Sequence, residues 1–301
     1  MGKSKRFGSP RCKYTMIAKT IGGSMMRKFS WMLLVLLVFW AGCQDQPKVE
    51  EKLNIKQSPS ALQTKETVDA QLAEDEKAMV IGSAKELKGV TAKKIIWKKD
   101  GAKMVLIPAS DTIKPFWMDA TEVTVDRFKK FLESSSYKPA KPIDWNDVSE
   151  DSPSDKHPMI YVSWHDATAY AKWAGKRLPT EKEWEFAARG GLTDKEYSWG
   201  EDESLARDYA NYEGRGGKDK WKSCAPVGSF KPNGYGLYDV AGNAWEWCQD
   251  WYDSDQDTKV LRGGNWYFKT YYLRVAYRNH NSPNNRTGII GFRCVSGSDN
   301  P

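Results

Sequence analysis

The side chains best suited to covalent or metal chemistry are those of the cysteines Cys224, Cys248 and Cys294. A thiolate can act as a nucleophile or bind a soft metal such as copper(I). Zinc sites and dithiol redox centres place their cysteines close together in the chain, and these cysteines have no such spacing. Because their number is odd, at least one lacks a partner for an intramolecular disulfide, and the sequence leaves the pairing open.

The histidines of the chain do not have the pattern of a metal site either. They are His157, His165 and His280. His157 precedes a proline and His165 lies in the first turn of an expected helix, so neither has the spacing of an iron-binding triad. We interpret them as surface or packing residues.

Three helices are expected in the first half of the folded part, each starting at a hydroxyl residue. The start signals are Thr121 or Thr124, then Ser163, and then Thr180. Thr180 forms a capping box with Glu183, in which each side chain binds the backbone amide of the other residue. These signals predict where the helices begin, because a cap acts within a single turn.

The second half of the chain is expected to consist mainly of loops. A short apolar strand is expected at residues 104–108, and Gly190 and Gly191 are expected to end the third helix. From Tyr197 onward, glycine, asparagine, aspartate and proline recur every few residues between short aromatic pieces. The pattern predicts an irregular α+β domain stabilised by tryptophan packing.

The N-terminal part has the pattern of an export signal. Its apolar run from Trp31 to Trp40 follows two basic residues and is too short to cross a hydrocarbon layer of roughly 30 Å as a mature helix. The run ends in Trp-Ala-Gly-Cys at 40–43, which resembles the lipobox of bacterial lipoproteins, with Cys43 as the lipidated residue. An ordinary secretory signal is the alternative. Gln44 is compatible with sorting to the outer membrane.

Composition divides the chain into three regions. We expect an N-terminal extension with a lipoprotein signal peptide at residues 1–43, a charged flexible linker at 44–94, and the folded domain at 95–297. Eight of the 46 basic residues lie in residues 1–42, which leaves 38 basic against 39 acidic residues. A nearly neutral mature chain gives no support for nucleic-acid binding. The expected location is the bacterial cell envelope, with membrane attachment through the lipid.

Seven short motifs follow one another along the folded part of the chain. They are Glu-Val-Thr at 122–124, Val-Ser-Trp-His-Asp-Ala at 162–167, Arg-Leu-Pro-Thr-Glu at 177–181, Asn-Gly-Tyr-Gly-Leu-Tyr-Asp at 233–239, Gly-Asn-Ala-Trp-Glu-Trp at 242–247, Arg-Gly-Gly at 262–264 and Gly-Phe-Arg at 291–293. In their order and spacing these motifs resemble the sulfatase-modifying-factor family, whose active members are formylglycine-generating enzymes, over residues 95–297. The resemblance implies an α+β, C-type-lectin-like fold with a small twisted antiparallel sheet and peripheral helices.

The resemblance also implies calcium as a structural cofactor that holds long loops. At a first site, Asp239 and Glu246 would offer side chains, and Gly242 and Ala244 would offer carbonyl oxygens. Calcium binds about six to eight oxygen ligands and mixes carboxylates with carbonyls, which suits an irregular loop. The alternative is that Asp239 caps a turn and Glu246 pairs with an arginine.

A second calcium site of the family corresponds to a set of four residues in this chain. They are Asn211 and Asp219 with their side chains, and Tyr212 and Trp221 with their carbonyl oxygens. The loop between them is shorter than is usual in the family.

The resemblance predicts that the family's catalytic centre is lost. Active members oxidise the cysteine of a Cys-x-Pro-x-Arg sulfatase sequence to formylglycine and bind copper(I) between two cysteines. The matching positions here are Phe268 and Leu273, whose hydrocarbon side chains cannot bind a metal. Asn265 replaces the serine of the Gly-Gly-Ser motif, whereas Trp245 of the active-site wall is retained. We therefore expect no catalytic residue and no copper.

Residues 265–289 occupy the place of the family's substrate surface and are rich in Tyr, Asn and Arg. Such side chains give rigid contact area and adaptable hydrogen bonds. The segment is also similar to the variable region of lectin-fold proteins that retroelements diversify. The candidate ligand-binding residues are Asn265, Tyr267, Phe268, Tyr271, Tyr272, Tyr277 and His280. The alternative is that they only pack and cap the fold.

These observations favour a non-catalytic, calcium-stabilised domain that acts as a binding or scaffold lipoprotein of the cell envelope. Its partner would be a protein or other ligand there. One alternative is a formylglycine-generating oxidase that works through Cys294 or Cys248. Another is an accessory lipoprotein of a secretion or gliding apparatus.

Overall fold

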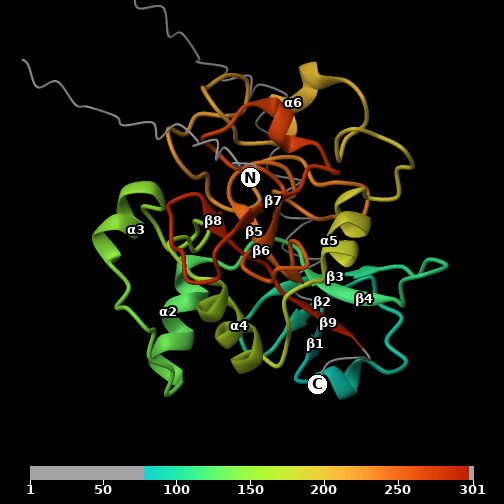
Figure 1. Ribbon diagram of the computed structural model, residues 1–301. Helices are drawn as coiled ribbons and strands as arrows, with labels where there is room; N and C mark the ends of the chain where they lie inside the picture. The colour runs from blue at the N-terminus through green and yellow to red at the C-terminus, as the bar shows by residue number, and fades with distance from the viewer. Residues whose placement is uncertain (1–77, 298–301) are drawn as a thin grey trace, which may run out of the picture. The chain divides into compact units, whose positions relative to one another are not determined.

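Two small sheets form the framework of residues 78–297, the part of the chain that this computed structural model describes (Figure 1). The first sheet has the strand order β1-β2-β3-β4-β9. Its strands are β1 (Met79–Ile81), β2 (Lys94–Trp97), β3 (Lys103–Ile107), β4 (Phe116–Asp119) and β9 (Val295–Gly297). The apolar strand expected at 104–108 is confirmed as β3.

The second sheet has the order β7-β6-β5-β8 and carries the residues of the candidate site. Its strands are β5 (Trp245–Trp251), β6 (Lys259–Arg262), β7 (Asn279–Asn281) and β8 (Ile290–Gly291). The family resemblance predicted one antiparallel sheet. Both sheets are instead mixed, because β1 pairs parallel to β2 and β5 pairs parallel to β8.

Short helices surround the sheets. They are η1 (Ala84–Leu87), α2 (Val125–Ser134), α3 (Trp145–Asp151), α4 (Trp164–Trp173), α5 (Glu181–Ala188), η2 (Glu203–Leu205), α6 (Ala206–Tyr209) and η3 (Thr270–Leu273). Figure 1 shows α2, α3 and α4 together on one flank of the sheets and α5 on the other. None of the helices in residues 78–297 is long and apolar enough to cross a membrane.

The three expected helix starts are confirmed. Thr124 caps α2 by accepting a hydrogen bond from the amide of Arg127. Ser163 and Asp166 form a capping box at α4, and Thr180 and Glu183 form one at α5. The chain leaves α5 through Gly190, whose φ of 59° lies in the left-handed region that glycine tolerates.

Helix α3 was not expected from the sequence. Asp144 caps this helix by accepting from the amide of Asn146 at 2.9 Å, but Val148 is its only fully buried residue. A helix of seven residues with a single buried side chain leaves no apolar periodicity to detect.

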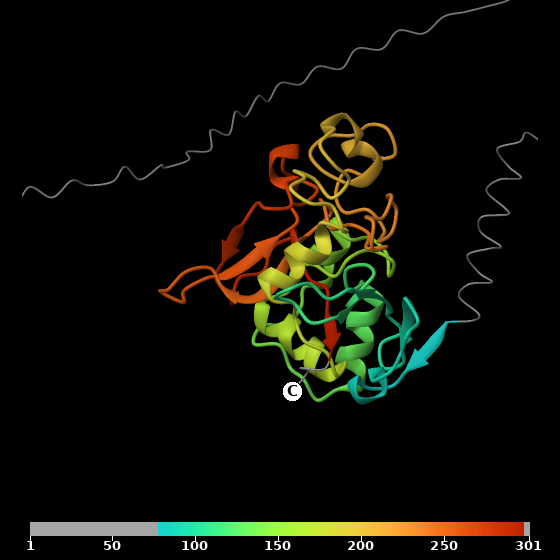
Figure 2. The same cartoon turned by 90° about the vertical axis from the view of Figure 1, so that its right-hand side faces the viewer.

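The folded region begins before the boundary expected at residue 95. Strand β1 and helix η1, at the start of the coloured ribbon in Figure 2, lie in the stretch that was assigned to the linker. Ile81 of β1 is buried in one cluster with Ile95 and Trp97 of β2. A single short strand with few apolar residues gives a weak sequence signal, although its backbone hydrogen bonds to β2 fix it in the sheet. The signal peptide, Cys43 and most of the expected linker lie outside the described residues.

Six of the eighteen buried residues of the main core are aromatic. Phe128 and Phe131 of α2 meet Tyr170 of α4 and Phe292, with ring centroids between 5.3 and 6.3 Å apart. Trp245 and Trp247 of β5 are also buried there, in agreement with a packing role. Between α5 and β5 the chain forms only η2 and α6, as the frequent turn residues predicted.

Candidate functional site

The first expected calcium site lies where the chain enters β5. Asp239 and Asn243 have φ values of 57° and 60°, which are unusual for residues with a side chain. Glu246 follows on β5 and is fully buried. This backbone directs polar side chains into the protein, where each needs a partner.

Glu246 has side-chain partners for both of its oxygens. Arg293 donates to Oε1 and Oε2, each at 2.8 Å, and the indole of Trp184 donates to Oε2 at 2.8 Å. Arg293 also donates to the carbonyl oxygens of Asp119 and Tyr238. The arrangement does not fit a calcium ligand, because a buried guanidinium repels a cation and already binds both oxygens. It matches the alternative of an ion pair with arginine.

Asp239 has a buried acid as its neighbour. Its Oδ2 accepts from the amide of Gly228 at 2.6 Å, whereas Oδ1 and the Oε2 of Glu122 are buried without another partner. Burial raises the pKa of Glu122 well above its usual range and that of Asp239 to about 6. Of the four expected ligands, Glu246 is thus bound by an arginine, whereas the calcium site at Asp239, Gly242 and Ala244 stays a prediction.

Asn243 is the polar residue of this region that the sequence analysis missed. Its Nδ2 donates to Glu122 at 2.9 Å, and its Oδ1 accepts from the amide of Ala225 at 2.8 Å and from the Nδ2 of Asn211 at 3.2 Å. Its carbonyl oxygen accepts from the amide of Trp266. Asn243 thus connects four segments that are distant in the sequence, and its place in the Gly-Asn-Ala-Trp-Glu-Trp motif is the only sequence signal for it.

The second expected calcium site also differs from the expectation. Asn211 uses its side-chain amide on the carbonyl of Ser223 and on Asn243. Asp219 pairs with Arg207 at 2.5 Å, and Arg207 also binds the carbonyl of Tyr212 at 3.2 Å. The backbone amide of Trp221 donates to Asp219 Oδ1 at 3.3 Å. Within residues 78–297, no group of three or more His, Cys, Asp or Glu side chains is arranged to hold a metal ion.

The two positions of the family's copper ligands lie on the segment that follows β6. Leu273 is fully buried at the end of η3, and Phe268 is half-buried with its ring 4.9 Å from that of Tyr272. Tyr272 in turn meets the buried ring of Trp245 at 6.5 Å. The place that would bind copper in an active member is therefore filled by packed hydrocarbon and aromatic groups.

A continuous aromatic face covers this region. Ring contacts connect Trp266, Tyr267, Phe268, Tyr272, Tyr271 and Tyr277. Tyr267 and Tyr271 are 61% and 51% exposed, which is high for large aromatic side chains. An open pocket of about 570 Å³ lies beside them, lined by Glu213, Gly214, Lys222, Trp266, Tyr267, Phe268, Lys269 and Tyr272. The structure thus brings together five of the seven candidate ligand-binding residues.

Asn265 and His280 do not belong to this face. Asn265 is buried, and its Oδ1 accepts from the amides of Tyr267 and Phe268 at 2.7 and 3.0 Å, so it holds the turn beneath them. His280 lies on β7, with its ring 4.2 Å from that of Tyr252. Sequence position alone could not distinguish inward from outward residues in an irregular loop.

The three cysteines within residues 78–297 are buried free thiols. Cys294, Cys248 and Cys224 belong to three different hydrophobic clusters. Burial raises the pKa of each thiol, that of Cys248 and Cys294 well above the usual range. A buried, protonated thiol is a poor nucleophile and a poor metal ligand, so the geometry gives no support to the oxidase alternative that relied on Cys294 or Cys248.

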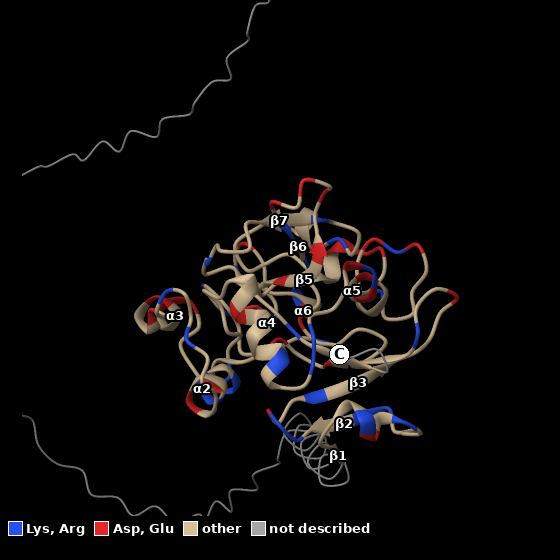
Figure 3. Ribbon diagram, turned by 60° about the horizontal axis from the view of Figure 1, so that its bottom comes forward, with Lys and Arg blue, Asp and Glu red and all other residues tan. Residues whose placement is uncertain are grey.

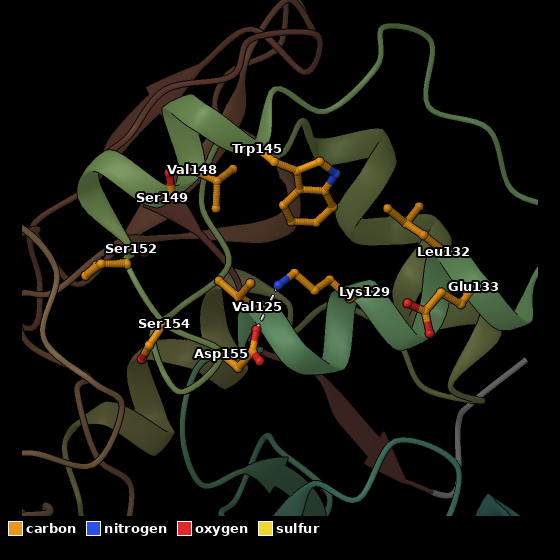
Figure 4. A pocket seen from close by; sticks show the side chains of 11 residues that line it. Val125, Lys129, Leu132, Glu133, Trp145, Val148, Ser149, Ser152, Ser154 and Asp155 are labelled. Atoms are coloured by element: carbon orange, nitrogen blue, oxygen red, sulfur yellow. Dashed lines mark hydrogen bonds and ion pairs between the residues drawn. The ribbon is translucent and has the colours of Figure 1, made fainter.

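A second cavity, of about 770 Å³, lies between α2 and α3, and the sequence analysis did not predict it because it missed α3. Val125, Leu132 and Val148 give it apolar walls (Figure 4). Lys129 lies near Trp145, 5.5 Å from the ring centroid, and pairs with Asp155 at 2.8 Å. The cavity between α2 and α3 shares no lining residue with the pocket beside the aromatic face.

Comparison with known proteins identifies the family. The model of the sulfatase-modifying factor enzyme 1-like domain matches residues 75–297. The chain belongs to the sulfatase-modifying factor family. The start of the match, at residue 75, agrees with the presence of β1 in the fold.

Relatives within the sulfatase-modifying factor family include active and inactive members. The chain is 45% identical over 168 residues to a formylglycine-generating enzyme of Streptomyces coelicolor, a match that covers 48% of this chain and 54% of that enzyme. It is 36% identical over 242 residues to an inactive C-alpha-formylglycine-generating enzyme 2 of Bos taurus, covering 63% of this chain and 80% of the relative. The chain thus spans about half the length of the Streptomyces enzyme.

A solved structure supports the fold of the sulfatase-modifying factor domain. PvdO from Pseudomonas aeruginosa superposes with a TM-score of 0.57 at 25% identity, covering 67% of this chain and 97% of PvdO. Residues 78–297 therefore have the α+β, C-type-lectin-like fold of formylglycine-generating-enzyme type, as the motifs predicted.

Proposed function

We propose that this sulfatase-modifying factor domain is a non-catalytic binding or scaffold module, and that its aromatic face contacts a protein or other ligand at the cell envelope. The observation that carries the proposal is the pair Phe268 and Leu273 at the copper positions. Neither side chain can bind copper or transfer an electron, and both are packed among other apolar groups. The relative from Bos taurus that is named inactive shows that such members occur in the family.

The exposed face supports a binding role. Tyr267 and Tyr271 present large rings with hydroxyl groups to solvent, and Lys222 and Lys269 flank the pocket beside them. Aromatic rings supply contact area at a low cost in side-chain entropy, and they are common in the centres of binding sites. Calcium, which the family resemblance implied, is not required for this binding role, because arginine side chains already bind Glu246 at the first expected site and Asp219 at the second.

The N-terminal sequence supports attachment to the membrane. The Trp-Ala-Gly-Cys sequence at 40–43 follows an apolar run, and a lipid on Cys43 would tether the domain through the residues that follow. The proposed location is thus the bacterial cell envelope, with Gln44 compatible with the outer membrane.

The decisive experiment is a mass-spectrometric assay for formylglycine. The purified full chain is incubated with a Cys-x-Pro-x-Arg peptide, copper(I) and oxygen, beside the Streptomyces coelicolor relative as a positive control. A peptide with serine in place of cysteine gives the background. We expect conversion by the relative and none above background by this chain. Conversion by this chain would overturn the proposal in favour of an oxidase.

A further inference from the structure

The loop at residues 212–221 is wrapped around a single side chain, that of Arg207 on α6. The guanidinium NH1 donates to the carbonyls of Tyr212 and Gly214, each at 3.2 Å, and to Asp219 Oδ2 at 2.5 Å. NH2 donates to the carbonyl of Glu213 at 2.6 Å. Arg207 thus binds three successive carbonyl oxygens and one carboxylate.

The loop has the shape that this arginine requires. The guanidinium carbon lies 3.5 Å from the centre of the Tyr212 ring, which adds a cation–π contact. A methyl group at Gly217 would lie 3.0 Å from the Cβ of Arg207, and one at Gly214 would lie 3.3 Å from its NH2. Both glycines also have φ values in the left-handed region, 56° and 84°. The loop can therefore approach the arginine closely only because these residues lack side chains.

Carbonyl oxygens together with a carboxylate are the ligands that a hard divalent cation prefers. In the 212–221 loop the positive charge beside these oxygens is that of the Arg207 guanidinium, and the Asp219 side chain that faces it is fully buried. A metal ion at the same oxygens would lie against the guanidinium, and the two positive charges would repel each other. Of the four groups that the family resemblance assigned to calcium, the Asp219 carboxylate and the Tyr212 carbonyl are therefore already bound by the guanidinium.

We propose that the guanidinium of Arg207 is the resident cation of the 212–221 loop and holds it without a metal ion. The loop is one wall of the pocket beside the aromatic face: the amide of Glu213 donates to the carbonyl of Phe268 at 3.0 Å, and Glu213 and Gly214 line the pocket. The shape of this pocket is therefore independent of calcium. This inference concerns the loop itself and does not depend on the ligand.

Limited trypsin digestion of the full chain tests the proposal directly. Lys218 lies in the loop and is exposed, so the rate of cleavage after it, mapped by mass spectrometry, reports how often the loop opens. For the wild-type protein we expect the same slow cleavage with a chelator and with millimolar calcium. Faster cleavage in the chelator would show that a metal holds the loop and would overturn the proposal.

The variant Arg207→Gln tests the arginine. We expect cleavage after Lys218 to become at least about tenfold faster, because the loop loses its charge-assisted hydrogen bonds. The matched control is Arg215→Gln, the same change at an exposed position of the same loop, which should leave cleavage after Lys218 unchanged. Near-UV circular dichroism establishes that the rest of the domain is folded. Cleavage of Arg207→Gln at the wild-type rate would overturn the proposal, as would equal acceleration in the control.

Discussion

Arg293 binds the Glu246 carboxylate that the family resemblance assigned to calcium. Both side chains are buried, and the guanidinium also binds carbonyl oxygens of Asp119 and Tyr238. One residue thus joins the end of β4, the chain before β5 and β5 itself. A buried pair of this kind is costly to break, because the remaining charge has neither water nor a partner.

The variant Arg293→Met should therefore lose about 3–5 kcal/mol of unfolding free energy, measured by urea denaturation. The matched control is Arg278→Met, which breaks an ion pair with Glu181 at a half-exposed arginine and should cost at most about 1 kcal/mol. Calcium should not restore the stability of Arg293→Met. Equal stability of the two variants would contradict the structural role of Arg293.

Helix α5 depends on the carboxylate at its third position. Burial disfavours ionisation of Glu183, but the hydrogen bonds from Arg177 and from the backbone of Thr180 outweigh it and hold the pKa of Glu183 below its usual value of 4.5. Arg177 donates twice to this carboxylate, at 2.6 Å each time. The start of α5 is thereby tied to the segment before it.

The pH dependence of stability should show this contribution. Because the folded pKa of Glu183 is lowered, its ionised form stabilises the fold fully above the unfolded pKa of about 4.5, and the contribution is lost as the pH falls through the folded pKa. We expect Glu183→Gln to lose about 1–3 kcal/mol of unfolding free energy at pH 7. The difference in unfolding free energy between this variant and the wild type should shrink below pH 4.5. Urea denaturation across this range measures it.

Glu201→Gln is the matched control for α5, since Glu201 pairs with Lys195 at 3.5 Å with both side chains about half exposed. Its effect should stay below about 0.5 kcal/mol. If the loss of unfolding free energy in Glu183→Gln is the same at pH 7 and below pH 4.5, the charge of the Glu183 carboxylate is not the cause of that loss.

At the scale of the whole molecule, charges of both signs are interspersed along the elements of the domain (Figure 3), which agrees with the near balance of 38 basic and 39 acidic residues after residue 42. The expectation that the chain has no nucleic-acid partner stays a prediction from this charge balance. The proposed contact with a membrane depends instead on the N-terminal cysteine, which lies outside the described residues.

Lipid attachment is tested in cells that process lipoproteins. The full chain should incorporate labelled palmitate and partition into the detergent phase of Triton X-114, because acyl chains favour apolar surroundings. Cys43→Ser should abolish both, whereas Cys12→Ser, the matched control at the other N-terminal cysteine, should change neither. Incorporation of label into Cys43→Ser at the wild-type level would exclude this anchor.

Much of the fold could be predicted from local sequence. The hydroxyl residues Thr124, Ser163 and Thr180 start helices where expected, and the apolar run at 104–108 forms a strand. The ordered motifs also predicted the fold, and the aromatic face was found from five of its residues. Caps and short apolar runs act within one turn or one strand, so the information that they carry is local.

The partners of the buried charges were decided by the tertiary structure alone. The sequence contains Arg293 and Arg207, but nothing near them shows that one meets Glu246 and the other meets the carbonyls of residues 212–214. The burial of the Asn265 side chain could not be predicted either, because no residue near it in the sequence shows that it points into the protein. An oxygen cage accepts a metal ion or a guanidinium equally well by composition, and only the folded chain determines which positive charge lies within reach of it.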